Sequence, residues 1–297
     1  MIHSTRQNTL RIYGILILIL SLLIGCASKK SLWGNPETGF VLQYRMAQGE
    51  SWTFHSATTE MTSMEMMGQS METETTIPLI YSIKGKGVDD QKNLLTEVTI
   101  DSMSWTTSSM QGDQEVDTKP VIGKSFGLTL SPIGKELEFK GTDEIPEIDL
   151  GQMGGKRKVK SLFRSALPDL PQDPVKIGDT WQSTEKLTEP QNNMDVTSNT
   201  ETINTLEGYE TIGNTECLKI KSKVTGTLDG SGNMMGNDMT FEGDIEGTST
   251  WYFDYKKGSL IRIISDGIME GTVAVSGQTN MTIPIVVESK VELKRVK

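Results

Sequence analysis

Residues 251–264 read Trp-Tyr-Phe-Asp-Tyr-Lys-Lys-Gly-Ser-Leu-Ile-Arg-Ile-Ile, and this stretch decides the predicted fold. An aromatic half and an aliphatic half flank Lys256-Lys257-Gly258, which predicts a strand, a tight turn and a second strand. Gly258 supplies the positive backbone φ that such turns commonly require. Residues 126–139 predict a second hairpin of this kind, and residues 61–80 predict a third with longer arms. The chain is therefore expected to be mainly β and antiparallel.

Landmarks of these hairpins recur along the chain at nearly constant spacing. Gly49-Glu-Ser-Trp52 is echoed by Gly178-Asp-Thr-Trp181, 129 residues later. Ile83-Lys-Gly85 is echoed by Leu206-Glu-Gly208 after 123 residues, and Gly134 by Gly258 after 124. Recurrence at one period indicates an internal duplication. We expect two similar, strongly curved antiparallel sheets, each a half-barrel-like repeat.

Between the two repeats, residues 156–167 predict an amphipathic helix. Val159, Leu162, Phe163 and Ala166 fall on one face at helical spacing, whereas the other face is basic. Pro168 would end the helix. The apolar face would pack on a sheet, and the basic face would lie in solvent or against anionic lipid head groups. The expected division of the chain is 1–25 signal peptide, 26–38 anchor-proximal linker, 39–141 first β repeat, 142–177 helix-containing connection and 178–297 second β repeat.

The N-terminus predicts export and a lipid anchor. Two arginines precede an uncharged run over residues 12–25, which is shorter than the roughly 20 residues of a spanning helix. The sequence Leu23-Ile24-Gly25-Cys26 resembles the lipobox of bacterial lipoproteins. That resemblance implies cleavage before Cys26 and covalent lipid on this cysteine, and more than one acyl chain anchors a protein stably. Ala27 is not acidic, which favours lipid anchoring in the cell envelope at the outer membrane, facing the periplasm.

Composition excludes several classes of function. Without residues 1–25, which carry Arg6 and Arg11 and no acid, the formal net charge changes from −10 to −12, which argues against nucleic acid as a partner. After residue 25, His55 is the only histidine, and Cys217 is the only cysteine besides Cys26. Nucleophilic triads need a histidine beside the nucleophile, and usual zinc sites need several His or Cys ligands. We expect no enzyme, and no cofactor beyond the lipid on Cys26.

Methionine is unusually frequent, with 16 in the chain. Thioethers are soft ligands suited to Cu(I), but methionine also fills adaptable apolar surfaces. Copper binding therefore stays open as one alternative. Its candidate ligands are Met61, Met64, Met66, Met67 and Met71.

Four stretches combine turn residues with aromatic or apolar residues: 66–71, 130–134, 167–181 and 251–258. Together they resemble an uncharacterised family of bacterial envelope lipoproteins related to the lipoprotein-carrier, or half-barrel, fold. The resemblance covers roughly residues 40 to 297. It implies a bent antiparallel sheet around an apolar cavity, with a helix over its mouth, that holds acyl chains. The chain differs from that family because it would contain this bent-sheet arrangement twice and would carry its own anchor.

The first functional hypothesis is therefore a non-enzymatic envelope lipoprotein that binds a lipid or an acylated partner in an apolar β concavity. The main alternative is a structural or assembly lipoprotein that binds proteins through its strand edges. Membrane contact through the anchor is expected in both cases. The candidate lining residues for a hydrophobic ligand are Trp52, Phe54, Trp105, Trp181, Trp251 and Phe253.

Overall fold

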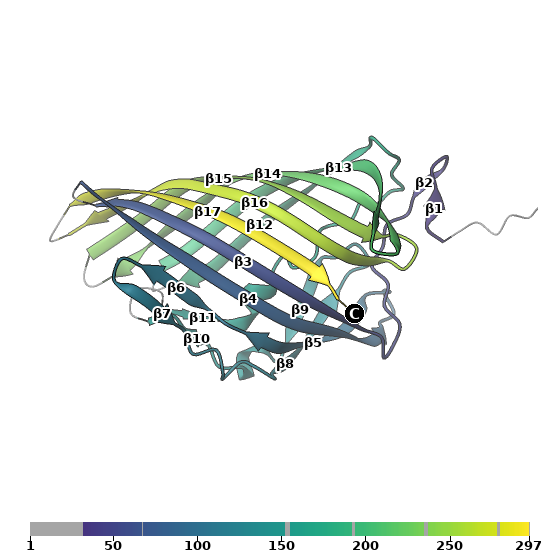
Figure 1. Cartoon of the computed structure of the whole chain (residues 1–297), viewed down its shortest axis with the longest axis horizontal. Helices are drawn as coiled ribbons and strands as arrows, with labels where there is room; N and C mark the ends of the chain where they lie inside the picture. Colours follow the sequence, from purple (N-terminus) through teal and green to yellow (C-terminus); the bar gives the residue numbers. More distant parts are fainter. Residues whose placement is uncertain are drawn as a thin grey trace, which may run out of the picture.

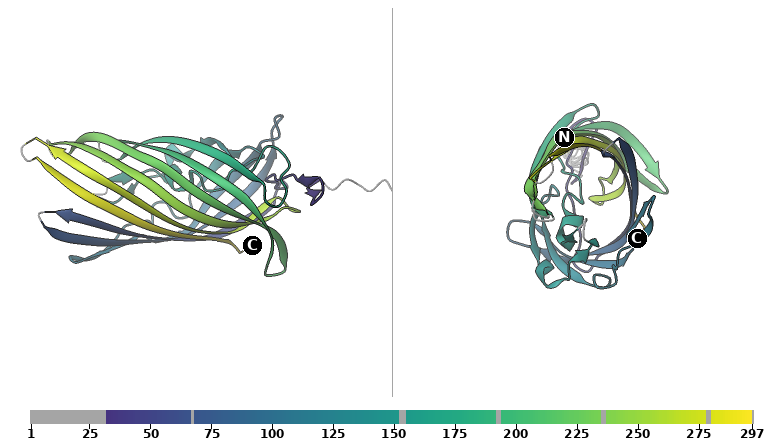
Figure 2. Two further views of the ribbon diagram at one scale, coloured as in Figure 1. Left: turned by 90° about the horizontal axis from the view of Figure 1, so that it is seen from above. Right: turned by 90° about the vertical axis from the view of Figure 1, so that its left-hand side faces the viewer.

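The computed structural model describes residues 32–66, 68–151, 155–191, 194–234, 237–277 and 280–296. Within these ranges the protein is an antiparallel β structure with one large, strongly curved sheet (Figures 1 and 2). The predicted signal peptide, Cys26 and Met67 lie outside them, so the predictions made for these residues stay predictions. No helix in the described ranges combines the length and the apolar character needed to cross a membrane.

Most strands of the large sheet are long. They are β3 (Ser51–Met66), β4 (Gln69–Val88), β5 (Leu94–Met103), β6 (Thr106–Ser109), β7 (Gly112–Glu115), β8 (Ser125–Leu130), β9 (Glu136–Lys140), β12 (Thr180–Gln191), β13 (Met194–Ile212), β14 (Thr215–Met234), β15 (Asn237–Asp254), β16 (Ser259–Ser276) and β17 (Met281–Arg295). Two small sheets pair β1 (Gly34–Asn35) with β2 (Gly39–Phe40), and β10 (Ile148–Asp149) with β11 (Lys156–Arg157).

The three hairpins predicted from the sequence are confirmed. β15 and β16 pair on either side of Gly258, whose φ is +74°. β8 pairs with β9, and β3 pairs with β4 along its whole length. Period-two alternation and local turn chemistry are sufficient to specify these neighbours because they involve few intervening residues.

One continuous sheet replaces the expected pair of sheets. Its strand order is β12-β13-β14-β15-β16-β17-β3-β4-β5-β8-β9, with β6 and β7 branching from β4. The two halves are joined because β17 pairs with β3, from Ile285 opposite Met64 to Arg295 opposite Phe54. This pairing satisfies backbone groups that two separate sheets would leave at exposed edges. Within the described residues this strand path is not closed, and β12 and β9 are its two ends.

The two Gly-acid-X-Trp landmarks make equivalent backbone contacts. The Gly49 N–H donates to the Gly85 carbonyl at 2.9 Å, and the Gly178 N–H donates to the Leu206 carbonyl at 2.8 Å. A register shift follows directly in each partner strand, at Gly85/Gly87 and at Leu206/Gly208. Equivalent bulges at equivalent points agree with the predicted duplication, which stays a prediction for the chain as a whole.

The packed core fills one end of the curved sheet. Inward side chains of several strands meet there, among them Trp52, Phe54, Ile220, Trp251 and Phe253, all at most 2% exposed. An extended segment, residues 40–46, crosses this end and buries Phe40, Leu42, Tyr44 and Met46. Its backbone lies between two hairpin turns: Tyr44 N–H donates to the Pro132 carbonyl at 2.8 Å, and Arg45 N–H donates to the Gly258 carbonyl at 2.9 Å.

The prediction of a connecting amphipathic helix over residues 156–167 is wrong. Residues 156–157 form β11, and Val159–Phe163 form a single 3₁₀ turn, η2, after the similarly short η1 (Thr142–Glu144). Arg164 is extended and Ser165 has a φ of +54°, so the helix cannot continue. Val159 and Phe163 are each 1% exposed, and a helix of this length is marginal alone. Burial of the apolar residues in the core therefore outweighs helical propensity.

Candidate functional site

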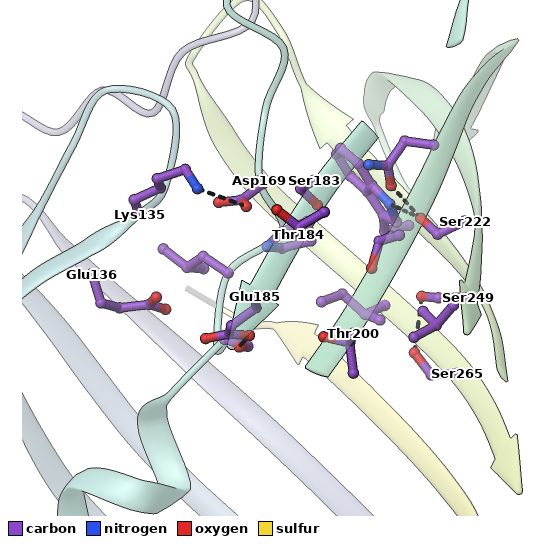
Figure 3. Close-up of a pocket in the computed structure, with 18 residues that line it drawn as sticks. Lys135, Glu136, Asp169, Ser183, Thr184, Glu185, Thr200, Ser222, Ser249 and Ser265 are labelled. Atoms are coloured by element: carbon purple, nitrogen blue, oxygen red, sulfur yellow. Dashed lines mark hydrogen bonds and ion pairs between the residues drawn. The ribbon is translucent and has the colours of Figure 1, made fainter. Parts of the chain in front are cut away.

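A cavity of about 340 Å³ lies on the inner face of the sheet, beside the packed core (Figure 3). Strands β12 to β16 form one wall, and the β8–β9 hairpin with the segment after η2 forms the other. The sheet wall contains Ser183, Thr184, Glu185, Thr200, Thr202, Asn204, Ser222, Val224, Ser249, Trp251, Ile263 and Ser265. The facing wall contains Lys135, Glu136, Ser165, Leu167, Pro168 and Asp169.

Hydrogen-bonded side chains form the part of the sheet wall nearest the core. The Trp251 indole N–H donates to Ser222 Oγ at 2.9 Å, and Ser222 Oγ donates to Asn204 Oδ1 at 2.6 Å. Ser265 Oγ donates to Ser249 Oγ at 2.8 Å. Because these groups satisfy one another, this part of the wall is rigid and polar. It does not present reactive groups.

Three carboxylates lie around the cavity, Glu136 and Asp169 on the facing wall and Glu185 on the sheet wall. Burial raises the pKa of Glu136 to about 7, and its Oε1 atom has no hydrogen-bond partner within the described part of the chain. Burial also raises the pKa of Asp169, opposed by Lys135, whose Nζ lies 3.6 Å from Asp169 Oδ2. Ser165 Oγ donates to the Glu185 carboxylate. Three acids thus face one lysine, and in Figure 3 the Glu136 carboxylate points toward Glu185.

Beyond the cavity, many inward positions of β14 to β17 and of the end of β3 are apolar. Strand register places Leu228, Gly243, Gly271, Ile285 and Met64 in one row across β14, β15, β16, β17 and β3. These positions face the same side as the buried core residues because they keep the two-residue period of their strands. We call the following set the apolar inner face: Met64, Leu228, Phe241, Ile245, Met269, Val273, Ile283, Ile285 and Val287. All of them are partly exposed except Phe241, which is buried.

The outer face over the same strands is acidic. Several of the outward positions that alternate with the apolar inner face on β14, β15, β16 and β17 are exposed acids. They are Asp229, Glu242, Asp244, Glu246, Glu270 and Glu288. Away from the packed core, the sheet can therefore contact water on its acidic outer face and hydrocarbon on its apolar inner face.

The aromatic residues proposed as ligand-lining residues lie mainly in the core. Trp52, Phe54, Trp105 and Phe253 are buried there, at 6% exposure or less. Trp251 is also buried, yet it forms part of the cavity wall. Trp181 is half-buried, and its indole N–H donates to the Asp169 carbonyl at 3.0 Å. The structure therefore brings one of the six, Trp251, to the cavity.

The methionines proposed as copper ligands lie on two faces. Met64 and Met71 are opposite each other in the β3–β4 ladder, and Met66 lies two residues along β3 on the same, inner face. Met61 is on the outer face and 36% exposed. Met61 is therefore separated from the other three by the sheet itself, and copper binding stays a prediction.

The remaining reactive residues are away from the cavity. His55 is exposed on the outer face of β3, between Ile80 and Lys294 in register. Cys217 is buried, and burial raises the pKa of its thiol to about 11. Within the described ranges, no group of three or more His, Cys, Asp or Glu side chains has the arrangement of a metal site.

Comparison with known proteins identifies no function. Residues 146–259 match a family of unknown function, DUF6263. No curated protein matches the chain. Similar solved structures include a loop-deletion mutant of OmpT, an outer membrane protein of Vibrio cholerae (10% identity, 84% of this chain and 100% of that chain, TM-score 0.18). Another is a DUF1329 family protein from Desulfovibrio piger (10% identity, 83% of this chain and 84% of that chain, TM-score 0.16).

The family match over residues 146–259 is compatible with an uncharacterised family, and the resemblance to lipoprotein carriers stays a prediction. Sequence reasoning missed the acids of the cavity, Glu136, Asp169 and Glu185, because three separate segments bring them together. One signal was available for the opposite wall. Ser222 follows Leu218 and Ile220 at the inward positions of its strand, where an apolar residue would be expected.

Proposed function

We propose that the protein is a non-enzymatic, membrane-anchored lipoprotein of the bacterial cell envelope that binds the acyl chains of a lipid or an acylated partner. The supporting observation is the apolar inner face, whose side chains are partly exposed inside a curved sheet with an acidic exterior. Covering apolar surface contributes about 25 cal/mol per Å², or about 0.8 kcal/mol per CH₂ group. Acyl chains would therefore bind there without catalytic groups.

The anchor is part of the same proposal. Lipid on Cys26, expected from its lipobox, would hold the curved sheet at the outer membrane, on the periplasmic side. A tethered protein of this kind would receive or present acyl chains near the membrane surface. Mass spectrometry of the protein from its native membrane tests the anchor directly, because an N-terminus at Cys26 carrying acyl groups is expected.

Binding of acyl chains is tested with the full chain and one pair of neighbouring substitutions. Ile285 faces inward on β17, and Val286 faces outward beside it. We expect native mass spectrometry to detect co-purifying lipid, and a fluorescent fatty acid to bind the unsubstituted protein and Val286→Glu. Ile285→Glu should weaken binding by about tenfold or more, because it places a charge against the hydrocarbon. Absence of both lipid and fatty-acid binding in the unsubstituted protein would overturn the proposal.

A further inference from the structure

The cavity and the apolar inner face form one continuous surface. Thr202 and Val224 of the cavity wall lie in one row across the sheet with Gly247 and Gly267. The neighbouring row of inward positions contains Ser249 and Ser265. The row on the other side of Gly247 and Gly267 contains Ile245 and Met269, which belong to the apolar inner face. From Gly247 to Met239, β15 extends the surface by about 26 Å, at about 3.3 Å per residue. A polar site at one end of an apolar path suits an amphiphile.

The charges of the cavity select the type of head group. Glu136, Asp169 and Glu185 offer carboxylate oxygens, and Lys135 is paired with Asp169. Glu136 lines the cavity, and its buried Oε1 atom has no hydrogen-bond partner in the described part of the chain. The hydroxyls of the sheet wall add further acceptors. A cationic donor satisfies such a site, whereas a phosphate or carboxylate head group binds it less tightly.

We propose that this cavity binds the primary ammonium head group of an amphiphile whose hydrocarbon chain lies along the apolar inner face. This inference rests on the proposed function, because the apolar inner face must first hold the chain. Glu136 and Glu185 accept hydrogen bonds from the ammonium. Ser222, Ser249 and Ser265 line the opposite side of the cavity, beyond the head group. At about 340 Å³, the cavity is within the usual range for small-ligand sites.

Three probes with the same twelve-carbon chain test the proposal: dodecylammonium, dodecanol and dodecanoate. Their dissociation constants for the full chain are measured by calorimetry at pH 8, below their micellar concentrations. Dodecylammonium should bind about tenfold tighter than dodecanoate, because charge-assisted hydrogen bonds are the stronger kind. Glu136→Gln should remove most of this preference by weakening the binding of dodecylammonium. Glu138→Gln, an exposed change on the same strand, should preserve the preference.

A second variant, Glu185→Gln, probes the opposite wall and should also reduce the preference for dodecylammonium. Equal binding of all three probes, or a preference that survives both Glu136→Gln and Glu185→Gln, would overturn the head-group inference and leave the proposed function standing. Failure of all three probes to bind would overturn the proposed function itself, and the head-group inference with it.

Discussion

Arg164 Nε lies 3.2 Å from Glu189 Oε1, and this ion pair spans the opening of the sheet. Glu189 belongs to β12, one edge of the sheet, and the Arg164 guanidinium also lies 5.6 Å from the ring centre of Phe139 in β9, the other edge. No strand pairing joins these two edges in the described chain. The segment after η2 therefore links them through one side chain.

Removing this link should destabilise the protein modestly. Because both side chains are partly buried, with 33% and 18% exposure, we expect a coupling energy of about 0.5–1 kcal/mol between Arg164 and Glu189. A double-mutant cycle with Arg164→Gln and Glu189→Gln, followed by urea unfolding, measures it. Lys156→Gln, a change at an exposed position outside this pair, serves as the control. Strictly additive single changes would mean that the pair does not hold the edges together.

Glu136 should make stability depend on pH. Its pKa is about 7 in the folded protein against an ordinary value of 4.5, so the folded state binds more protons between these values. Stability should therefore fall as pH rises from 4.5 to 7, by about 2–3 kcal/mol for this group. The nearby charges of Glu185 and Asp169 also raise the pKa of Glu136.

The contribution of Glu136 is isolated by substitution. The difference in unfolding free energy between the unsubstituted protein and Glu136→Gln should change across this pH window and become constant above pH 8. Urea unfolding at several pH values provides the measurement. A constant difference from pH 4.5 to 8 would contradict the raised pKa of this carboxyl group.

Ser222 connects two buried polar groups in the cavity wall. In Ser222→Ala, the Trp251 indole N–H loses its acceptor and Asn204 Oδ1 loses a donor, at a cost of about 2 kcal/mol. Ser231→Ala, at an exposed position of the same strand, should change stability by less than about 0.5 kcal/mol. Thermal unfolding followed by circular dichroism compares the two. Similar melting temperatures would show that the network adds little.

Gly258 combines a turn with a close contact. Its φ is +74°, and a Cβ atom there would lie 2.5 Å from the Gln43 carbonyl oxygen. Gly213 has a φ of +61° but no neighbour within 4 Å of such a Cβ. Gly213→Ala should therefore cost about 1 kcal/mol for backbone strain, and Gly258→Ala about 2–4 kcal/mol, because residues 40–46 must move. Equal losses in denaturant unfolding would contradict the tight packing of this segment.

Sequence patterns alone do not predict the cavity. Glu136, Asp169 and Glu185 stand in three separate segments of the chain, and no local sequence pattern distinguishes them from solvated acids. They converge because the β8–β9 hairpin and the segment after η2 fold onto the inner face of β12. The aromatic residues illustrate the opposite case. Their burial was foreseeable from size, yet only Trp251 also borders the cavity.

Local sequence is sufficient to specify the antiparallel hairpins, because alternation and turn glycines act between near neighbours along the chain. It also predicts the lipid anchor, which stays a prediction. Tertiary structure decided that β17 joins β3 into one sheet, that residues 156–167 form a strand and a 3₁₀ turn, and that three acids share one cavity. Those outcomes depend on burial and pairing between distant segments, and local residue preferences do not encode such contacts.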